Sequence, residues 1–158
     1  MQPEQRLSLF LRWWVTLCAA ACGLAALIAL VAWVSQQWQV WTFGQGYIPM
    51  APSTALSLMA LSGVALAQAH WGGRRWVVTA CWLTAGACGL LGLGVLLAAA
   101  LGATLPIEAI LAPDPQKVSG FPIGRMSPLT ATQLVLAALA LLLQRPLTRR
   151  WRLRQLGV

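Results

Sequence analysis

The sequence predicts an all-α integral membrane protein, a four-helix bundle that forms a single domain over residues 1–158. Hydrophobic residues make up 59% of the chain and charged residues only 9%, and the mean hydropathy is +0.72. Because a soluble domain carries about 25% charged residues, this composition excludes a water-soluble globule. Three long intervals, residues 13–73, 76–107 and 126–144, contain no charged side chain at all.

Polar and turn-forming breaks divide these intervals into spans of the bilayer. An α-helix needs about 20 apolar residues to cross the hydrocarbon core, so the first interval must hold two spans. It is interrupted at residues 35–37, 44–46 and 49. We therefore expect transmembrane helices at residues 11–34, 52–70, 76–104 and 128–145. The third is long enough to tilt or protrude, and the Pro-rich stretch after it predicts a short interfacial helix at 105–112.

The arginines set the expected orientation of the helices. Nine of the ten gather before the first helix, between the second and third, and after the fourth, at Arg6, Arg12, Arg74, Arg75, Arg145, Arg149, Arg150, Arg152 and Arg154. By the positive-inside rule, both chain termini are expected in the cytoplasm. The basic tail at 145–158 would anchor on anionic lipid of the inner leaflet. The net charge of +8 is too clustered to indicate a nucleic-acid partner, so the expected partner is the lipid bilayer.

The chain repeats itself at two pairs of helix starts. Residues 12–23 and 75–86 share the pattern R-W-x-V-T-x-C-x4-G, and residues 50–55 and 126–131 share the pattern M-x-P-x-T-A. These patterns predict two-helix units, repeat A at about 12–73 and repeat B at about 75–148. Both units start in the cytoplasm, so they are parallel and not inverted repeats. The alternative is coincidence within a biased composition.

The second pattern carries a resemblance to a known family. Residues 50–55 and 124–131 resemble the recurrent G-R-M-x-P-N-T-A segments of a multi-pass membrane region in bacterial signalling proteins, where it precedes PAS, histidine-kinase or GGDEF (diguanylate cyclase) modules. Ser53 and Leu129 stand where that region usually has Asn. The resemblance implies a sensory or anchoring module of the bacterial inner membrane that couples helix packing to a cytoplasmic output module. Arg149-Arg150-Trp151 looks like the start of a further unit, as expected for a longer protein that has been cut or for a stand-alone relative.

The residues alone leave a second function class open, a small accessory subunit of a larger membrane complex or a homodimer, because Gly- and Ala-rich faces suit close helix packing. A transporter is less expected, since no charged residue lies deep in a predicted span. His70, the single histidine, is expected to be solvated at the cytoplasmic end of the second helix. Glu108 and Asp114 lie in the outer loop without a supporting histidine. We therefore expect no enzyme activity, cofactor or metal.

A ligand site is predicted where the second and fourth helices begin at the outer face. Pro at the first helical position and Ser127 as N-cap are typical of helix starts. The positive ends of both helix dipoles point outward, and Arg125 stands beside the second. A small anion or the polar head of a lipophilic ligand could bind there; the alternative is that Arg125 extends to lipid headgroups. The expected site residues are Met50, Thr54, Arg125, Met126 and Thr130.

The cysteines raise the question of a thiolate metal site. They form one pair on each helix that starts with the R-W pattern, Cys18 with Cys22 and Cys81 with Cys88. Four thiolates at similar depth could bind a metal. However, small residues and threonines fall on the other side of each helix, at Thr16, Gly23, Thr79 and Gly86. Because close helix packing favours such residues, we expect these four to turn into the bundle. The cysteines then face lipid or a neighbouring element, reduced and without metal.

Overall fold

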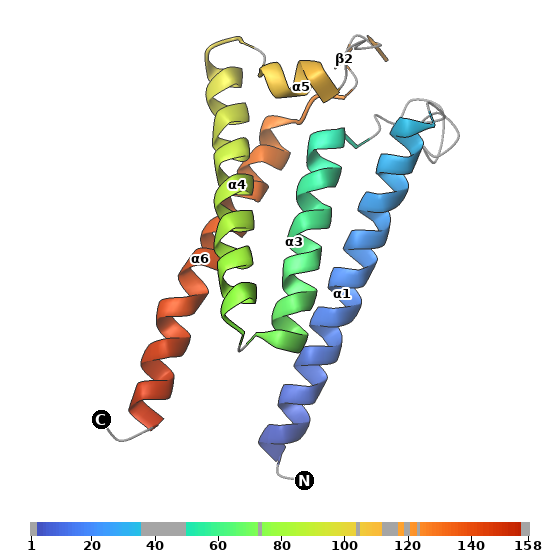
Figure 1. Cartoon of the computed structure of the whole chain (residues 1–158). Coiled ribbons are helices and arrows are strands. Elements are labelled where there is room, and N and C mark those ends of the chain that lie inside the picture. Colours follow the sequence, from blue (N-terminus) through green and yellow to red (C-terminus); the bar gives the residue numbers. More distant parts are fainter. Residues whose placement is uncertain are drawn as a thin grey trace.

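The computed structural model describes residues 3–35, 50–72, 74–103, 105–111, 117–118, 121–122 and 124–155, and this part of the chain is almost entirely helical. The long helices are α1 (Pro3–Val34), α3 (Pro52–Trp71), α4 (Arg75–Ala100) and α6 (Pro128–Gln155). The short elements are α5 (Pro106–Leu111), β1 (Lys117–Val118) and β2 (Phe121–Pro122), and the two strands pair antiparallel. Successive long helices alternate in direction, so α1 begins and α6 ends at the same end of the molecule (Figure 1).

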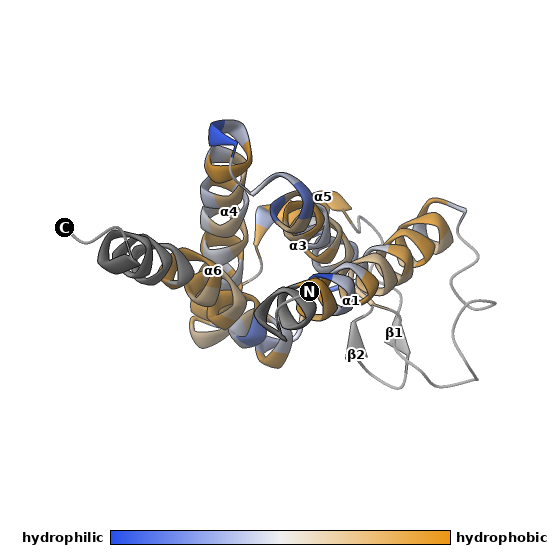
Figure 2. Ribbon diagram, turned by 90° about the horizontal axis from the view of Figure 1, so that it is seen from below, coloured by the Kyte–Doolittle hydropathy of each residue, from blue (hydrophilic) through white to orange (hydrophobic). Residues whose placement is uncertain are grey.

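Hydropathy identifies the chain as a membrane protein. Within the described residues, α1, α3 and α4 are long and apolar enough to cross a membrane, and α6 contains a shorter apolar segment at Pro128–Leu143. Hydrophobic residues lie around the long helices and not only on one side (Figure 2). Large side chains such as Leu83 and Leu90 are exposed on the surface, whereas most buried positions are Ala, Ser, Cys or Val. Small residues at helix contacts and large apolar ones outside are typical of helices packed in lipid.

The helix starts agree with the sequence, but one helix end does not. Helices α3 and α6 begin at Pro52 and Pro128, as expected. Ser127 caps α6, because its Oγ accepts a hydrogen bond from the N–H of Thr130 at 3.1 Å. Helix α4 was expected to reach residue 104 but ends at Ala100. Gly102 adopts a φ of +65° there, and the N–H of Ala103 donates to the Ala98 carbonyl at 2.8 Å, which closes the helix in a Schellman motif.

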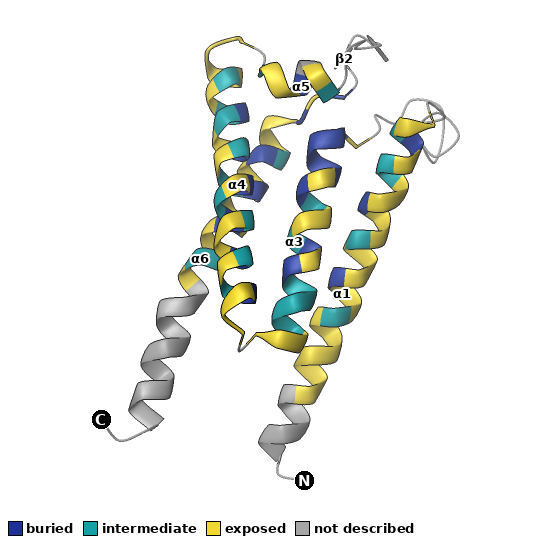
Figure 3. Ribbon diagram, viewed as in Figure 1, coloured by how far each residue is buried: buried dark blue, intermediate teal, exposed yellow. Residues whose placement is uncertain are grey.

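Both outer helices of the arrangement differ from expectation in length. Helix α1 begins at Pro3, well before residue 11, and α6 continues to Gln155, so the basic segment expected as a tail is helical. The long helices pack extensively as two pairs, α1 with α3 and α4 with α6, while the contact between α3 and α4 is smaller. The buried residues of α3 gather mostly in its first half, whereas those of α1 and α4 are spread along the helix (Figure 3).

Helix α1 turns its small residues toward α3. A Cβ added at Gly23 would lie 3.5 Å from the Cβ of Ser62, so the two backbones approach closely there. Thr16 is half-buried on the same side, and its hydroxyl donates to the Arg12 carbonyl at 2.8 Å. The two cysteines of this helix, Cys18 and Cys22, are exposed.

On α4 the expected orientation is wrong, because the cysteines and not the threonine face the neighbouring helix. Cys81 is 1% exposed and Cys88 is 5% exposed. Thr79 is exposed instead, and a Cβ added at Gly86 would meet nothing within 4 Å. The Cys81 Sγ accepts a hydrogen bond from Gln68 Nε2 at 2.8 Å, and the Cys88 thiol points at the Ser57 carbonyl, 4.0 Å away. Polar groups of α3 therefore line the contact with α4.

Helix α4 packs against α6 through a second face, which contains Gly89 and Gly92. A Cβ added at Gly92 would lie only 2.9 Å from the Ala131 carbonyl oxygen, and one at Gly89 would lie 3.3 Å from the Ala138 Cβ. Both contacts are with α6. Helix α4 thus has two partners, and the close backbone approach falls at Gly92 and not at Gly86.

Candidate ligand pocket between α3 and α6

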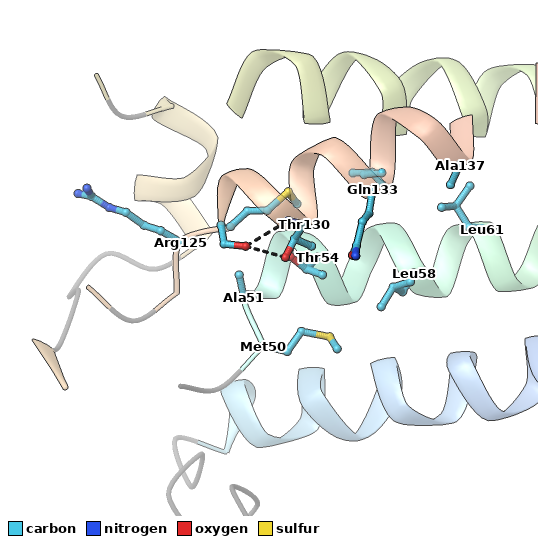
Figure 4. Close-up of a pocket in the computed structure, with 12 residues that line it drawn as sticks. Met50, Ala51, Thr54, Leu58, Leu61, Arg125, Thr130, Gln133 and Ala137 are labelled. Carbon is cyan, nitrogen blue, oxygen red and sulfur yellow. Dashed lines mark hydrogen bonds between the residues drawn. The ribbon is translucent and has the colours of Figure 1, made fainter. Parts of the chain in front are cut away.

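A pocket lies between α3 and α6, toward the end of the molecule where both helices begin (Figure 4). This end is here called the pocket end (Figure 1). The two helices make few direct contacts, and a cavity of about 650 Å³ lies between them. Its walls come from the start and middle of both helices and from the residues just before α6. They are Met50, Ala51, Thr54, Leu58, Leu61, Arg125, Met126, Ser127, Thr130, Gln133, Leu134 and Ala137.

The structure brings all five expected site residues to this pocket, but one of them points away. Thr54 and Met126 are buried in the wall, and Met50 and Thr130 border the cavity. The guanidinium of Arg125 is exposed and extends away from the other lining residues (Figure 4). The cavity therefore presents hydroxyl groups and sulfur atoms, and the positive charge stays outside it.

Gln133 is a lining residue that the sequence reasoning missed. It stands on α6, and its side chain reaches across toward α3 near Leu58 (Figure 4). The available signal was an amide within the apolar segment at Pro128–Leu143, because polar groups in such segments need a partner.

Side chains from the preceding elements fix the two methionines at the mouth of the pocket. The indole Nε1 of Trp33 donates a hydrogen bond to the Met50 carbonyl at 2.7 Å. The carboxylate of Glu108 accepts one from the Met126 N–H at 2.9 Å, and Glu108 is only 7% exposed. Glu108 on α5 thus fixes the backbone just before α6 begins. Among the described residues it is not paired with another acid. Asp114 lies outside the described residues.

The described residues contain no cluster suited to a metal ion. No three His, Cys, Asp or Glu side chains among them converge on one point, and the four cysteines are free thiols. His70 is exposed at the opposite end from the pocket, where its Nδ1 lies 3.1 Å from the Leu66 carbonyl oxygen. The polar groups that do lie close together are the hydroxyls and the Gln133 amide of the pocket between α3 and α6. Surrounded by apolar side chains, these groups are suited to binding a ligand.

Comparison with known proteins finds none that is similar to this chain. No protein-family model matches the chain, and no curated protein or solved structure shows significant similarity to it.

Proposed function

We propose that the chain is a non-catalytic sensory module of a bacterial signalling protein, in which a lipophilic ligand between α3 and α6 changes the position of α6. One observation carries the proposal. A single helix, α6, forms one wall of the pocket at its start and continues without interruption to Gln155, through the segment that holds five arginines. A change at the pocket would therefore be carried toward the other end of the molecule through one continuous helix.

The proposed topology has four spans, with the pocket at the outer face of the inner membrane and both termini in the cytoplasm. The start of α1, the end of α6 and the turn before α4 hold most of the arginines and point to the same end of the molecule, opposite the pocket end (Figure 1). This asymmetry is what the positive-inside rule requires. In the proposed repeats, Ala55 and Ala131 take equivalent positions after the two helix starts, and both are fully buried.

The proposed ligand is an amphiphile with a neutral polar head. Leu58, Leu61 and Leu134 supply an apolar wall for a chain or ring. Polar groups are spaced along the cavity, from the hydroxyl of Thr130 near the mouth to the amide of Gln133 further in (Figure 4). Since the guanidinium of Arg125 points away, the site does not require an anionic head. A hydrogen bond from such groups in an apolar site orients a ligand as well as binding it.

A distance measurement between α1 and α6, on the side opposite the pocket, tests this coupling. Spin labels at Leu9 on α1 and Leu143 on α6, in a chain whose cysteines are replaced, report how the far ends of the two helices are arranged in nanodiscs. The pocket-filling variant Ala137→Phe should shift the distance distribution, because Ala137 lines the cavity. The control Leu139→Phe lies on the exposed side of the same helix and should leave it unchanged. Equal distributions for both variants would contradict the proposal.

The accessory-subunit alternative makes a different prediction. A subunit of a larger complex would co-purify in mild detergent with partner chains in fixed stoichiometry, and a partner helix would cover the apolar surface of α4 around Leu83 and Leu90. A chain that purifies alone, with α6 responding to the filled pocket, supports the sensory module.

A further inference from the structure

A second, smaller pocket lies at the opposite end from the ligand pocket, between the first part of α1 and the last turn of α3. Its volume is about 240 Å³, and it is lined by Leu9, Arg12, Trp13, Thr16 and His70. In the proposed topology this end meets the inner leaflet, at the depth of the lipid headgroups. None of these residues takes part in the ligand pocket between α3 and α6.

Arg12 supplies the charge of this second pocket. Its Nη2 donates to the His70 carbonyl at 3.5 Å, a long contact that uses one of the five guanidinium hydrogens. The Thr16 hydroxyl donates to the Arg12 carbonyl, so its oxygen can accept a further hydrogen bond. His70 Nδ1 faces the Leu66 carbonyl, which only accepts, so that nitrogen carries the hydrogen and Nε2 stays free of this bond. The guanidinium is therefore the main donor available to a bound group.

The surroundings of this second pocket favour an anion beside an apolar chain. Arg74 and Arg75 lie at the same end, as does Glu4 near the start of α1, while Glu108 lies at the pocket end. Trp71 and Trp76 stand together there, with ring centroids 6.2 Å apart. Tryptophan and arginine side chains at one level are typical of the membrane–water interface. Leu9 and Trp13, which are 42% and 67% exposed, give the pocket an apolar side open toward the bilayer.

We infer that this second pocket binds the phosphate headgroup of an anionic glycerophospholipid. A guanidinium binds phosphate oxygens through short, charge-assisted hydrogen bonds, and its planar fork can make two at once. Leu9 and Trp13 then contact the glycerol and the first methylenes of the acyl chains. A free phosphate would lack this apolar contact, which is why the lipid and not the ion is the expected occupant.

Native mass spectrometry of the full chain with defined lipids tests the inference. Phosphatidylglycerol should remain bound in preference to phosphatidylcholine. Arg12→Gln should lower the affinity for phosphatidylglycerol about tenfold, as expected for loss of a charge-assisted hydrogen bond. The matched control Arg75→Gln removes the same charge at the same end but outside the pocket, and it should change the affinity less than about twofold. Equal losses in the two variants would overturn the inference, as would equal binding of the two lipids.

A second pair of variants keeps the test valid if Arg12→Gln weakens the contact with α3. Thr16→Glu places a carboxylate in the pocket and should reduce phosphatidylglycerol binding, whereas Thr79→Glu places one at the equivalent, exposed position of α4 and should not. Helix content measured by circular dichroism must match between the two. Added inorganic phosphate should fail to compete with the lipid. Competition at equal concentration would overturn the assignment to a lipid.

Discussion

Helices α1 and α4 contain the same pattern of residues, at 12–23 and 75–86, and bury opposite sides of it. On α1 the side that holds Gly23 packs against α3, and the cysteines are exposed. On α4 Cys81 and Cys88 are buried against α3, and Thr79 is exposed. A local pattern that recurs in the chain therefore does not decide which side of a helix is buried.

The number of neighbours explains the difference. Helix α1 packs mainly against α3, so one close approach, at Gly23, suffices. Helix α4 lies against both α3 and α6, and its small residues are needed where the backbone of α6 comes nearest, at Gly92. The threonines do not determine which side of the helix is buried. The hydroxyls of Thr16 and Thr79 both donate to the carbonyl four residues earlier on their own helix, so neither needs a partner on a neighbouring helix.

The largest expected effect comes from filling the closest approach of α4. Gly92→Leu should lower the free energy of unfolding by about 3 kcal/mol or more, since even a Cβ there lies 2.9 Å from the Ala131 carbonyl oxygen and from the Val135 Cγ2. Gly86→Leu should change it by less than about 0.5 kcal/mol. Titration with denaturing detergent, followed by circular dichroism, measures both. A loss of stability at Gly86 equal to that at Gly92 would show that the repeat pattern, and not the neighbour, sets the face.

The cysteines give the next contrast. Cys88→Leu should destabilise the chain by about 2 kcal/mol, because the added volume must fit between α4 and Ser57 of α3. Cys22→Leu adds the same volume on the exposed side of α1 and should be close to neutral. The same titration compares them, and a costly change at Cys22 would indicate that α1 is covered by another chain.

The hydrogen bond between Glu108 and the Met126 N–H extends the comparison to the pocket end. Glu108→Ala should cost about 1.5 kcal/mol, because it leaves the buried N–H of Met126 without its acceptor. Glu108→Gln keeps an acceptor oxygen and should recover most of this loss. Thermal unfolding in detergent measures both variants. If the glutamine variant is as unstable as the alanine variant, the charge of Glu108 and not its hydrogen bond is what stabilises the start of α6.

The smallest effect is expected at the polar contact between α3 and α4. Gln68→Leu removes the hydrogen bond to the Cys81 Sγ and should cost about 0.6 kcal/mol, the usual value for such bonds between membrane helices. A double-mutant cycle with Cys81→Ala isolates the pair. A coupling energy near zero would mean that the amide is equally well solvated without the thiol.

Hydropathy and helix-start chemistry were sufficient to predict much of the fold. The charge-free intervals and the prolines at 52 and 128 located three apolar helices and the starts of α3 and α6. The end of α4 differs from the prediction because Gly102 adopts the left-handed conformation that ends a helix, although the residues around it are apolar. The buried face of α4 could not be predicted, since it depends on two neighbours and not on the residues of α4 alone.

The candidate site was predictable where it follows from a local motif and not where it depends on the tertiary fold. The M-x-P-x-T-A pattern led to four residues that the structure places around one cavity, Met50, Thr54, Met126 and Thr130. The outward direction of Arg125 and the bond between Glu108 and Met126 depend on how the loop before α6 folds back on α5. No periodicity in the sequence reports such a contact, because its partners are 18 positions apart in the sequence and belong to different elements.

Photolabelling with a membrane-soluble probe tests the central claim, that the cavity between α3 and α6 is a binding site for a neutral amphiphile. A long-chain alcohol that carries a diazirine on its alkyl chain is irradiated with the full chain in bilayers, and the labelled residues are identified by mass spectrometry. We predict labels at Leu58, Leu61 and Gln133 that disappear in Ala137→Phe, while labels at the exposed Leu83 and Leu90 of α4 persist. Labels spread evenly over all apolar surfaces and unchanged by Ala137→Phe would contradict the claim.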